Sequence, residues 1–131
     1  SRREQNARSL KFRRILNYLD EHSGRTIRLD TLAADFGLSK SSLLRMFREM
    51  LGTSPIDHLL NLRLEKGARR LRDGSESIIE IAVGCGFGDG NYFSKMFRRK
   101  FGVSPRDYRK RFIAAESMQN LHRQFAFPFD R

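Results

Sequence analysis

Glycines occupy every second position in one short stretch of the chain, GCGFGDGN at residues 84–91. Glycine-rich loops of this kind can hold the phosphates of a nucleotide, because their backbone amides approach phosphate oxygens closely. A dinucleotide-binding loop needs a preceding strand and a following acidic partner, and a P-loop needs Gly-Lys-Ser/Thr. Neither context is present, so the sequence argues against a phosphate-binding loop and the glycines need another explanation.

The other residue types that carry chemistry are few and scattered. His22, His58 and His122 lie too far apart to offer the ligand spacing of a metal site. Cys85 is the only cysteine, so no internal disulfide can form. No paired carboxylates, and no nucleophile with its base, fall at a shared site. The sequence predicts that the protein is not an enzyme and uses no cofactor.

Charge points to a polyanionic partner. Lys and Arg number 26 against 15 Asp and Glu, which gives a formal net charge of +11. Nucleic acid and an anionic membrane surface are the two usual partners of such an excess. No apolar run approaches the roughly 20 residues of a membrane span, and no signal segment opens the chain. We expect a cytoplasmic protein with no membrane partner.

An internal repeat explains the glycines. Residues 37–55, GLSKSSLLRMFREMLGTSP, match residues 86–105, GFGDGNYFSKMFRRKFGVSP. Five residues recur 50 positions later: Met46, Phe47, Gly52, Ser54 and Pro55 as Met96, Phe97, Gly102, Ser104 and Pro105. Upstream the displacement is 49, with Leu32, Ala33 and Gly37 matching Ile81, Ala82 and Gly86. A repeat with a one-residue slip at a turn indicates two copies of one supersecondary unit.

Each copy has the pattern of a short helix, a glycine turn and a second helix. In the first copy we expect Asp30 and Thr31 to cap the short helix, Gly37 to form the turn and Ser39 to cap the second helix. In the second copy, Ser77 and Asp89 take the capping positions. Such a helix-turn-helix unit lays its second helix, the recognition helix, in the DNA major groove.

The glycines can now be assigned. Gly86 is the turn glycine, Gly88 lies in the expanded turn and Gly90 falls in the first turn of the second recognition helix. Gly84 sits within the predicted short helix, where glycine costs about 1 kcal/mol relative to alanine, and close helix packing is the one reason we can offer. Cys85 matches a residue on the core stripe of the first copy, which predicts a small buried hydrophobe.

The whole chain is predicted to be all-α, with two helix-turn-helix units and about seven helices. The segments are a basic segment or linker at 1–9, the first unit at 10–54, a linking helix at 55–74, the second unit at 75–112 and a tail of unknown role at 113–131. At about 1.5 Å per residue the linking helix would span roughly 25 Å or more. One turn of DNA is roughly 34 Å, so a rigid rod of this size could hold two recognition helices in successive major grooves.

The tail carries alternating phenylalanines at Phe125, Phe127 and Phe129. These side chains could pack on the domain, dock on a partner or belong to a disordered segment, and the sequence does not choose among the three.

The chain resembles the DNA-binding domain of the AraC/XylS family of bacterial transcription regulators over about residues 10–112. The resemblance rests on the tandem units, the long helix between them and the stretch IAVGCGFGDGNYFSKMFRRKFGVSPRDYR. That stretch follows the family signature of glycine-Phe, Tyr-Phe, Phe-Lys/Arg-Lys/Arg, Phe-Gly and Ser-Pro-x-x-Tyr-Arg.

The resemblance implies sequence-specific binding to promoter DNA and regulation of transcription, usually activation through contact with RNA polymerase. A separate ligand-binding or dimerisation domain often controls such proteins, and none is visible in these 131 residues. We expect a fragment or a small stand-alone member, which binds DNA as a monomer unless a missing N-terminal domain dimerises it.

The outward face of each recognition helix is predicted to meet the DNA. Removing the buried positions leaves Ser41, Leu44, Arg45 and Arg48, and 50 positions later Asn91, Ser94, Lys95 and Arg98. The resemblance implies contacts to base edges by Ser41, Leu44, Arg45, Gly90, Asn91, Ser94 and Lys95. Arg45 suits guanine, Asn91 suits adenine and Leu44 suits a thymine methyl. The sequence departs from the family at Gly90, which offers no side chain, and at Ser41, which is small.

Other polar residues beside these helices are expected to position the duplex by contacting phosphates: Ser39, Lys40, Arg48, Arg98 and Arg99. The alternative function is a non-sequence-specific architectural DNA binder, which would share the charge but need no polar reading face. A protein-docking helical module would not need the charge, and high salt would leave its binding largely intact.

Overall fold

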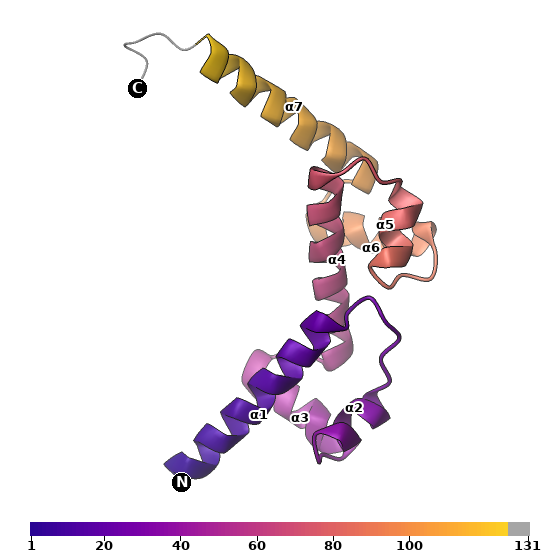
Figure 1. Ribbon diagram of the computed structural model, residues 1–131. Coiled ribbons are helices and arrows are strands. Elements are labelled where there is room, and N and C mark those ends of the chain that lie inside the picture. The colour runs from indigo at the N-terminus through magenta and orange to yellow at the C-terminus, as the bar shows by residue number, and fades with distance from the viewer. Residues whose placement is uncertain (126–131) are drawn as a thin grey trace.

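The computed structural model describes residues 1–125, and these form seven helices and no strand (Figure 1). The helices are α1 (Arg2–Glu21), α2 (Leu29–Asp35), α3 (Lys40–Leu51), α4 (Pro55–Asp73), α5 (Ile78–Gly84), α6 (Gly90–Phe101) and α7 (Pro105–Gln124). The predicted all-α class and the predicted number of helices are confirmed.

Helix α4 runs through the middle of the molecule. Helices α1 to α3 lie at its N-terminal end, α5 and α6 lie beside its C-terminal part, and α7 leads away from that end (Figure 1). Two separate hydrophobic clusters correspond to the two units. The first is formed by Phe12, Ile15, Leu19, Leu32, Ala33, Leu43, Met46 and Phe47. The second is formed by Leu64, Ala68, Leu71, Ile81, Ala82, Cys85, Phe87, Phe93 and Phe97. Helix α4 thus joins the units and also supplies one side of the second core.

Local signals account for most helix starts. Ser39, Ser77 and Asp89 cap α3, α5 and α6 as predicted, each accepting a hydrogen bond from a backbone amide in the first turn. Gly37 and Gly86 have φ values of +69° and +96°, a region that favours glycine. These turns direct each recognition helix away from the helix before it.

The start of α2 differs from the prediction. Arg28 is its N-cap residue and makes no side-chain capping bond, and Asp30 lies within the first turn, so the predicted caps at Asp30 and Thr31 are wrong. Ile27 and Leu29 are partly buried against the first core. At the start of this helix, apolar packing is therefore present and a polar side-chain cap is absent.

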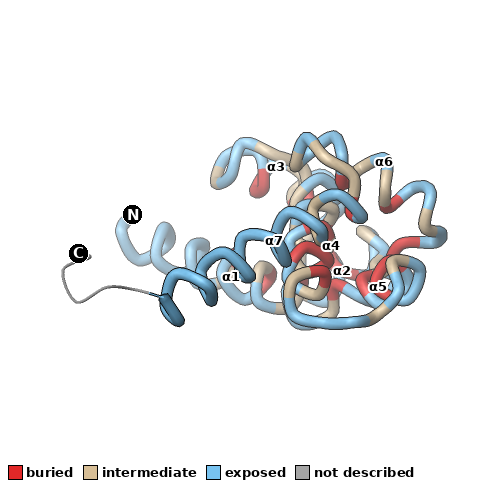
Figure 2. The backbone as a smooth tube through the Cα atoms, turned by 90° about the horizontal axis from the view of Figure 1, so that it is seen from above, coloured by how far each residue is buried: buried red, intermediate tan, exposed pale blue. Residues whose placement is uncertain are grey.

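The terminal helices are longer than predicted. Helix α1 begins at Arg2, where Ser1 and Glu4 form a capping box, so the basic segment at residues 2–9 is helical. Helix α7 continues through the predicted tail to Gln124, and every residue from Lys110 to Phe125 is exposed. Figure 2 shows the outer turns of both helices away from the buried centre. Phe127 and Phe129 lie outside the described residues.

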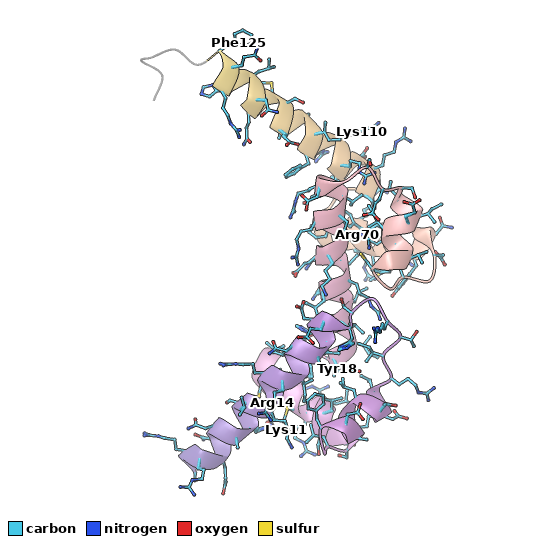
Figure 3. The ribbon with its side chains drawn as sticks, viewed as in Figure 1. Lys11, Arg14, Tyr18, Arg70, Lys110 and Phe125 are labelled. Carbon is cyan, nitrogen blue, oxygen red and sulfur yellow. The ribbon has the colours of Figure 1, made fainter. Side chains whose placement is uncertain are left out.

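Gly84 allows a side chain from α4 to reach the second core. A Cβ at this position would lie 3.0 Å from Cζ of Arg70 and closer still to its guanidinium nitrogens. Arg70 lies between α4 and α5 (Figure 3), where it pairs with Glu76 and donates to Sγ of Cys85 at 3.8 Å. Cys85 is buried as predicted, and burial raises the pKa of its thiol. The glycine is therefore explained by close packing against Arg70.

Candidate nucleic-acid interface

The first recognition helix, α3, exposes the predicted polar face. Ser41, Arg45 and Arg48 are exposed and Leu44 is half-buried, while Leu43, Met46 and Phe47 on the other side are in the core. Because Ser39 accepts from the amide of Ser42 at 3.1 Å, the start of the helix is fixed. The predicted residues of this helix therefore share one accessible surface.

The second recognition helix, α6, has the same arrangement. Asn91 and Lys95 are exposed, Gly90 and Ser94 are half-buried, and Phe93 and Phe97 face the core. Asp89 holds the first turn by accepting from the amide of Tyr92 at 2.7 Å. Arg98 and Arg99 are exposed toward the end of the helix.

Both recognition helices lie on one side of the molecule. Viewed from above, α3 and α6 follow the same edge of the structure, with α4 behind them (Figure 2). In the other view they are separated along the length of α4 (Figure 1). With its 19 residues, α4 spans about 28 Å at about 1.5 Å per residue. A single continuous helix therefore fixes both the distance and the direction between the two polar faces.

Each recognition helix is also braced by an ion pair. Glu49 of α3 pairs with Arg8 of α1. Lys100 of α6 lies 3.7 Å from Glu65 of α4 and donates to Asn61 at 3.2 Å. Pairs as exposed as these contribute little stability, about 0–1 kcal/mol each. Their geometric effect is to restrict how each helix rolls against its neighbour.

The basic residues of the molecule fall into two groups. The first group is used internally: Arg63 donates to the carbonyls of Ser23 and Arg25, Lys66 pairs with Asp20, and Arg72 donates to the Tyr108 hydroxyl at 2.8 Å.

The second group is free to meet a partner. Its members are exposed and make no side-chain hydrogen bond or ion pair with residues 1–125. On the recognition helices they are Arg45, Arg48, Lys95, Arg98 and Arg99, and Arg14 and Arg69 are examples elsewhere. Lys40 is the exception among the cations predicted to contact phosphates, because its Nζ lies 4.0 Å from Oδ1 of Asp30. Apart from Lys40, the cations predicted to face the DNA are therefore unpaired.

Two residues beside this surface were not among the predicted contacts. Ile79 and Val83 of α5 are aliphatic and yet 67% and 58% exposed. They line a groove with Asn91 and Ser94 of α6. The internal repeat could have indicated them. At the matching positions, 49 residues earlier, the first copy has the polar Asp30 and the small Ala34, whereas the second copy has two aliphatic side chains.

Among residues 1–125, no group of three or more His, Cys, Asp or Glu side chains is placed to hold a metal ion. Within the same part of the chain, none of the helices has the length and apolar character needed to cross a membrane.

The arrangement is that of a tandem helix-turn-helix domain, and the comparisons with known proteins agree. The family model described as "Helix-turn-helix domain" matches residues 32–111. The transcriptional activator RhaS of Klebsiella pneumoniae (strain 342) is 40% identical over 100 residues, which are 76% of this chain and 36% of that protein. RhaS of Salmonella schwarzengrund (strain CVM19633) has the same identity and coverage. The chain spans about a third of the length of the curated relatives it matches.

Solved structures extend the agreement. A transcriptional regulator with an AraC-type DNA-binding domain, from Chromobacterium violaceum, superposes with a TM-score of 0.76 at 31% identity, covering 79% of this chain and 93% of that one. The DNA-binding domain of AdpA, solved in complex with a target DNA, gives a TM-score of 0.75 at 30% identity, with 78% and 92% covered. The chain belongs to the AraC-type family of helix-turn-helix transcription regulators.

Proposed function

We propose that this chain binds promoter DNA sequence-specifically, with α3 and α6 in successive major grooves. The supporting observation is that both recognition helices lie on the same side of α4 (Figure 2) and that each carries exposed, unpaired basic side chains. A helix of fixed length between them suits a duplex whose grooves recur at a fixed spacing of roughly 34 Å. The AdpA domain, solved with a target DNA, supports duplex DNA as the partner.

The residues of the interface are proposed to divide by role. Contacts to base edges are assigned to Ser41, Leu44, Arg45, Gly90, Asn91, Ser94 and Lys95. Phosphate contacts are assigned to Ser39, Lys40, Arg48, Arg98 and Arg99. Arg45 is the strongest single candidate, since an exposed, unpaired guanidinium can pair bidentately with guanine and contribute about 1–3 kcal/mol of discrimination.

Regulation is proposed to follow from binding. The relatives named above are transcriptional activators, which supports activation of transcription through contact with RNA polymerase. Two recognition helices in one chain are enough to contact two grooves, so this chain is proposed to bind as a monomer. A chain with this function would act on bacterial promoters in the cytoplasm.

The test is a selection of bound sequences from a random duplex pool at physiological salt, with the natural sequence and with Arg45→Ala and Lys95→Ala. Two preferred blocks about one helical turn apart are expected, and each variant should relax one block and weaken binding to it by about 5- to 150-fold. Arg14→Ala is the control for charge, because Arg14 is an exposed cation on α1 (Figure 3). An unenriched pool with binding that falls steeply with salt would instead identify a backbone binder.

A further inference from the structure

A groove of about 510 Å³ lies beside the start of α6, and one of its walls is apolar. Ile79 and Val83, one turn apart on α5, form that wall, and Asn91 and Ser94 of α6 line the groove opposite them. Asn91 and Ser94 are two of the proposed base contacts. The groove is therefore continuous with the proposed DNA interface.

Glycine at position 90 keeps the apolar wall accessible. A Cβ built on Gly90 would lie 3.6 Å from Cγ1 of Ile79, which is ordinary van der Waals contact. A longer side chain here would therefore begin in contact with Ile79 and could cover it. With glycine, Ile79 remains 67% exposed at the edge of the groove.

The first unit has a different surface at the matching positions. Asp30 and Lys40 stand where the second copy has Ile79 and Gly90, and their charged atoms lie 4.0 Å apart. An ion pair between the two helices of the first unit is thus replaced by an isoleucine and a glycine in the second. Both residues of the ion pair differ between the two copies, so the matching surface is charged in the first copy and apolar in the second.

The major groove of DNA offers one apolar group to such a wall, the C5-methyl group of thymine. Asn91 suits the N6 and N7 edge of adenine, which is the partner of thymine in a base pair. We propose that Ile79, Val83 and Gly90 form a receptor for a thymine methyl group in the second block of the DNA site. The inference rests on the proposed function and adds a base contact from α5, outside the recognition helix.

This contact would give Gly90 a role in base selection. The residue contributes no hydrogen bond, but its lack of a side chain lets a methyl group approach Ile79. The second unit would then select thymine by shape and apolar contact, whereas the first unit relies on the guanidinium of Arg45.

The test uses the full chain and the duplex obtained from the selection, with each thymine of the second block replaced singly by uracil. Uracil keeps the base pair and the O4 acceptor and removes only the methyl group. For the natural sequence, one or two replacements should weaken binding about fourfold, which corresponds to about 0.8 kcal/mol for one buried methyl group. Ile79→Ala should bring the thymine-to-uracil ratio at those positions close to one.

Two controls keep the test specific. Ile56→Ala removes a similarly exposed isoleucine, 60% exposed on α4, and should leave the fourfold ratio intact. Ratios at thymines of the first block should not respond to Ile79→Ala. Equal melting temperatures of the variants would show that folding is unchanged.

Three outcomes would overturn the inference while leaving the proposed function standing. They are a selected second block without thymine, a ratio near one for the natural sequence, and a ratio that survives Ile79→Ala combined with Val83→Ala. Loss of transcription in that double variant with an unchanged ratio would point instead to a protein partner at this surface. If no block is enriched at all, the proposed function fails, and the inference fails with it.

Discussion

The two helix-turn-helix units share one plan but differ in how firmly their helices are held. Helix α5 begins with a capping box between Ser77 and Glu80, whereas α2 begins at Arg28 with no side-chain cap. The second core has one continuous series of ring contacts from Phe87 through Phe93, Phe97 and Phe101 to Tyr108. The ring contacts of the first unit fall into two shorter groups, Phe12–Phe47–His58 and His22–Tyr18–Phe36. The second unit, which has the capping box and the continuous series of rings, also has the less charged surface beside its recognition helix. A repeated fold therefore does not require repeated chemistry.

Truncating the central aromatic residue of each core should have the largest effect. Phe97 and its repeat partner Phe47 are fully buried, so Phe97→Ala and Phe47→Ala should each lower the free energy of unfolding of their own unit by about 3–5 kcal/mol. Because the clusters are separate, hydrogen exchange should rise in α5 and α6 for Phe97→Ala, and in α2 and α3 for Phe47→Ala. Equal loss of protection in both units would mean that the chain has a single cooperative core.

In the second unit the ring of Phe93 packs closely against Gly67 of α4, and a larger residue at position 67 should disturb this contact. A Cβ on Gly67 would lie 2.8 Å from Cε1 of Phe93, so Gly67→Ala should overpack this contact and destabilise the protein by about 1–3 kcal/mol. The loss should exceed the gain in helix propensity, about 1 kcal/mol. Denaturant unfolding measures the net change, and Arg69→Ala, at an exposed position on the same helix, is the control. A stabilised Gly67→Ala variant would contradict the predicted overpacking.

Adding a cap to α2 should bring the two units closer together in stability. Arg28 occupies the N-cap position with a suitable extended backbone, φ −102° and ψ 130°, but its side chain makes no capping hydrogen bond with the first turn. Arg28→Ser should therefore stabilise the first unit by about 1 kcal/mol. Ser77→Ala is the reciprocal change and should destabilise the second unit by a similar amount. Thermal unfolding of both variants checks the pair, and an unchanged first unit would show that packing alone holds α2.

The smallest expected difference between the two units is in how their stability depends on pH. His58 and Tyr108 occupy matching positions, and their rings lie 5.9 Å from Phe47 and 5.3 Å from Phe97. Burial lowers the pKa of His58 from its usual 6.5, and the charges of Glu65 and Asp20 oppose that shift without cancelling it.

The folded protein binds this proton less tightly than the unfolded chain does, so stability should be full above pH 6.5 and should fall as the pH drops below that value. His58→Tyr should remove this part of the pH dependence, measured as unfolding midpoints between about pH 7.5 and about pH 5. Tyr108→Phe should leave the dependence as it is. If His58→Tyr retained the same slope, another group would be responsible for it.

The sequence predicted the elements whose limits are set locally. Ser39, Pro55, Ser77 and Asp89 are the residues at which α3, α4, α5 and α6 begin or are capped, because a cap needs only its own first turn. The start of α2 depends on how Ile27 and Leu29 pack on the first core, which a local signal cannot give. Helix α7 continues past the repeat, and the sequence is compatible with this because no glycine or proline interrupts residues 106–124.

The exposed faces of α3 and α6 could be predicted for a similar reason, since helical spacing separates core positions from outward ones. The sequence could not show which cations are used internally. Lys100 and Arg99 are neighbours in the sequence, but only Lys100 reaches an acidic partner on α4, at Glu65. That choice depends on the distance between two helices and on the direction of each side chain.

The continuous helix α4 also restricts how the chain can change in length. Each residue of an α-helix advances about 1.5 Å and turns about 100°, so one inserted residue in α4 would swing α6 by more than a quarter turn relative to α3. Seven inserted residues would restore the direction to within about 20° but would shift α6 by about 10 Å. The turn at residues 86–89 has already absorbed an extra residue relative to the first copy. Among related domains, insertions and deletions should therefore be found in the turns and be absent from α4.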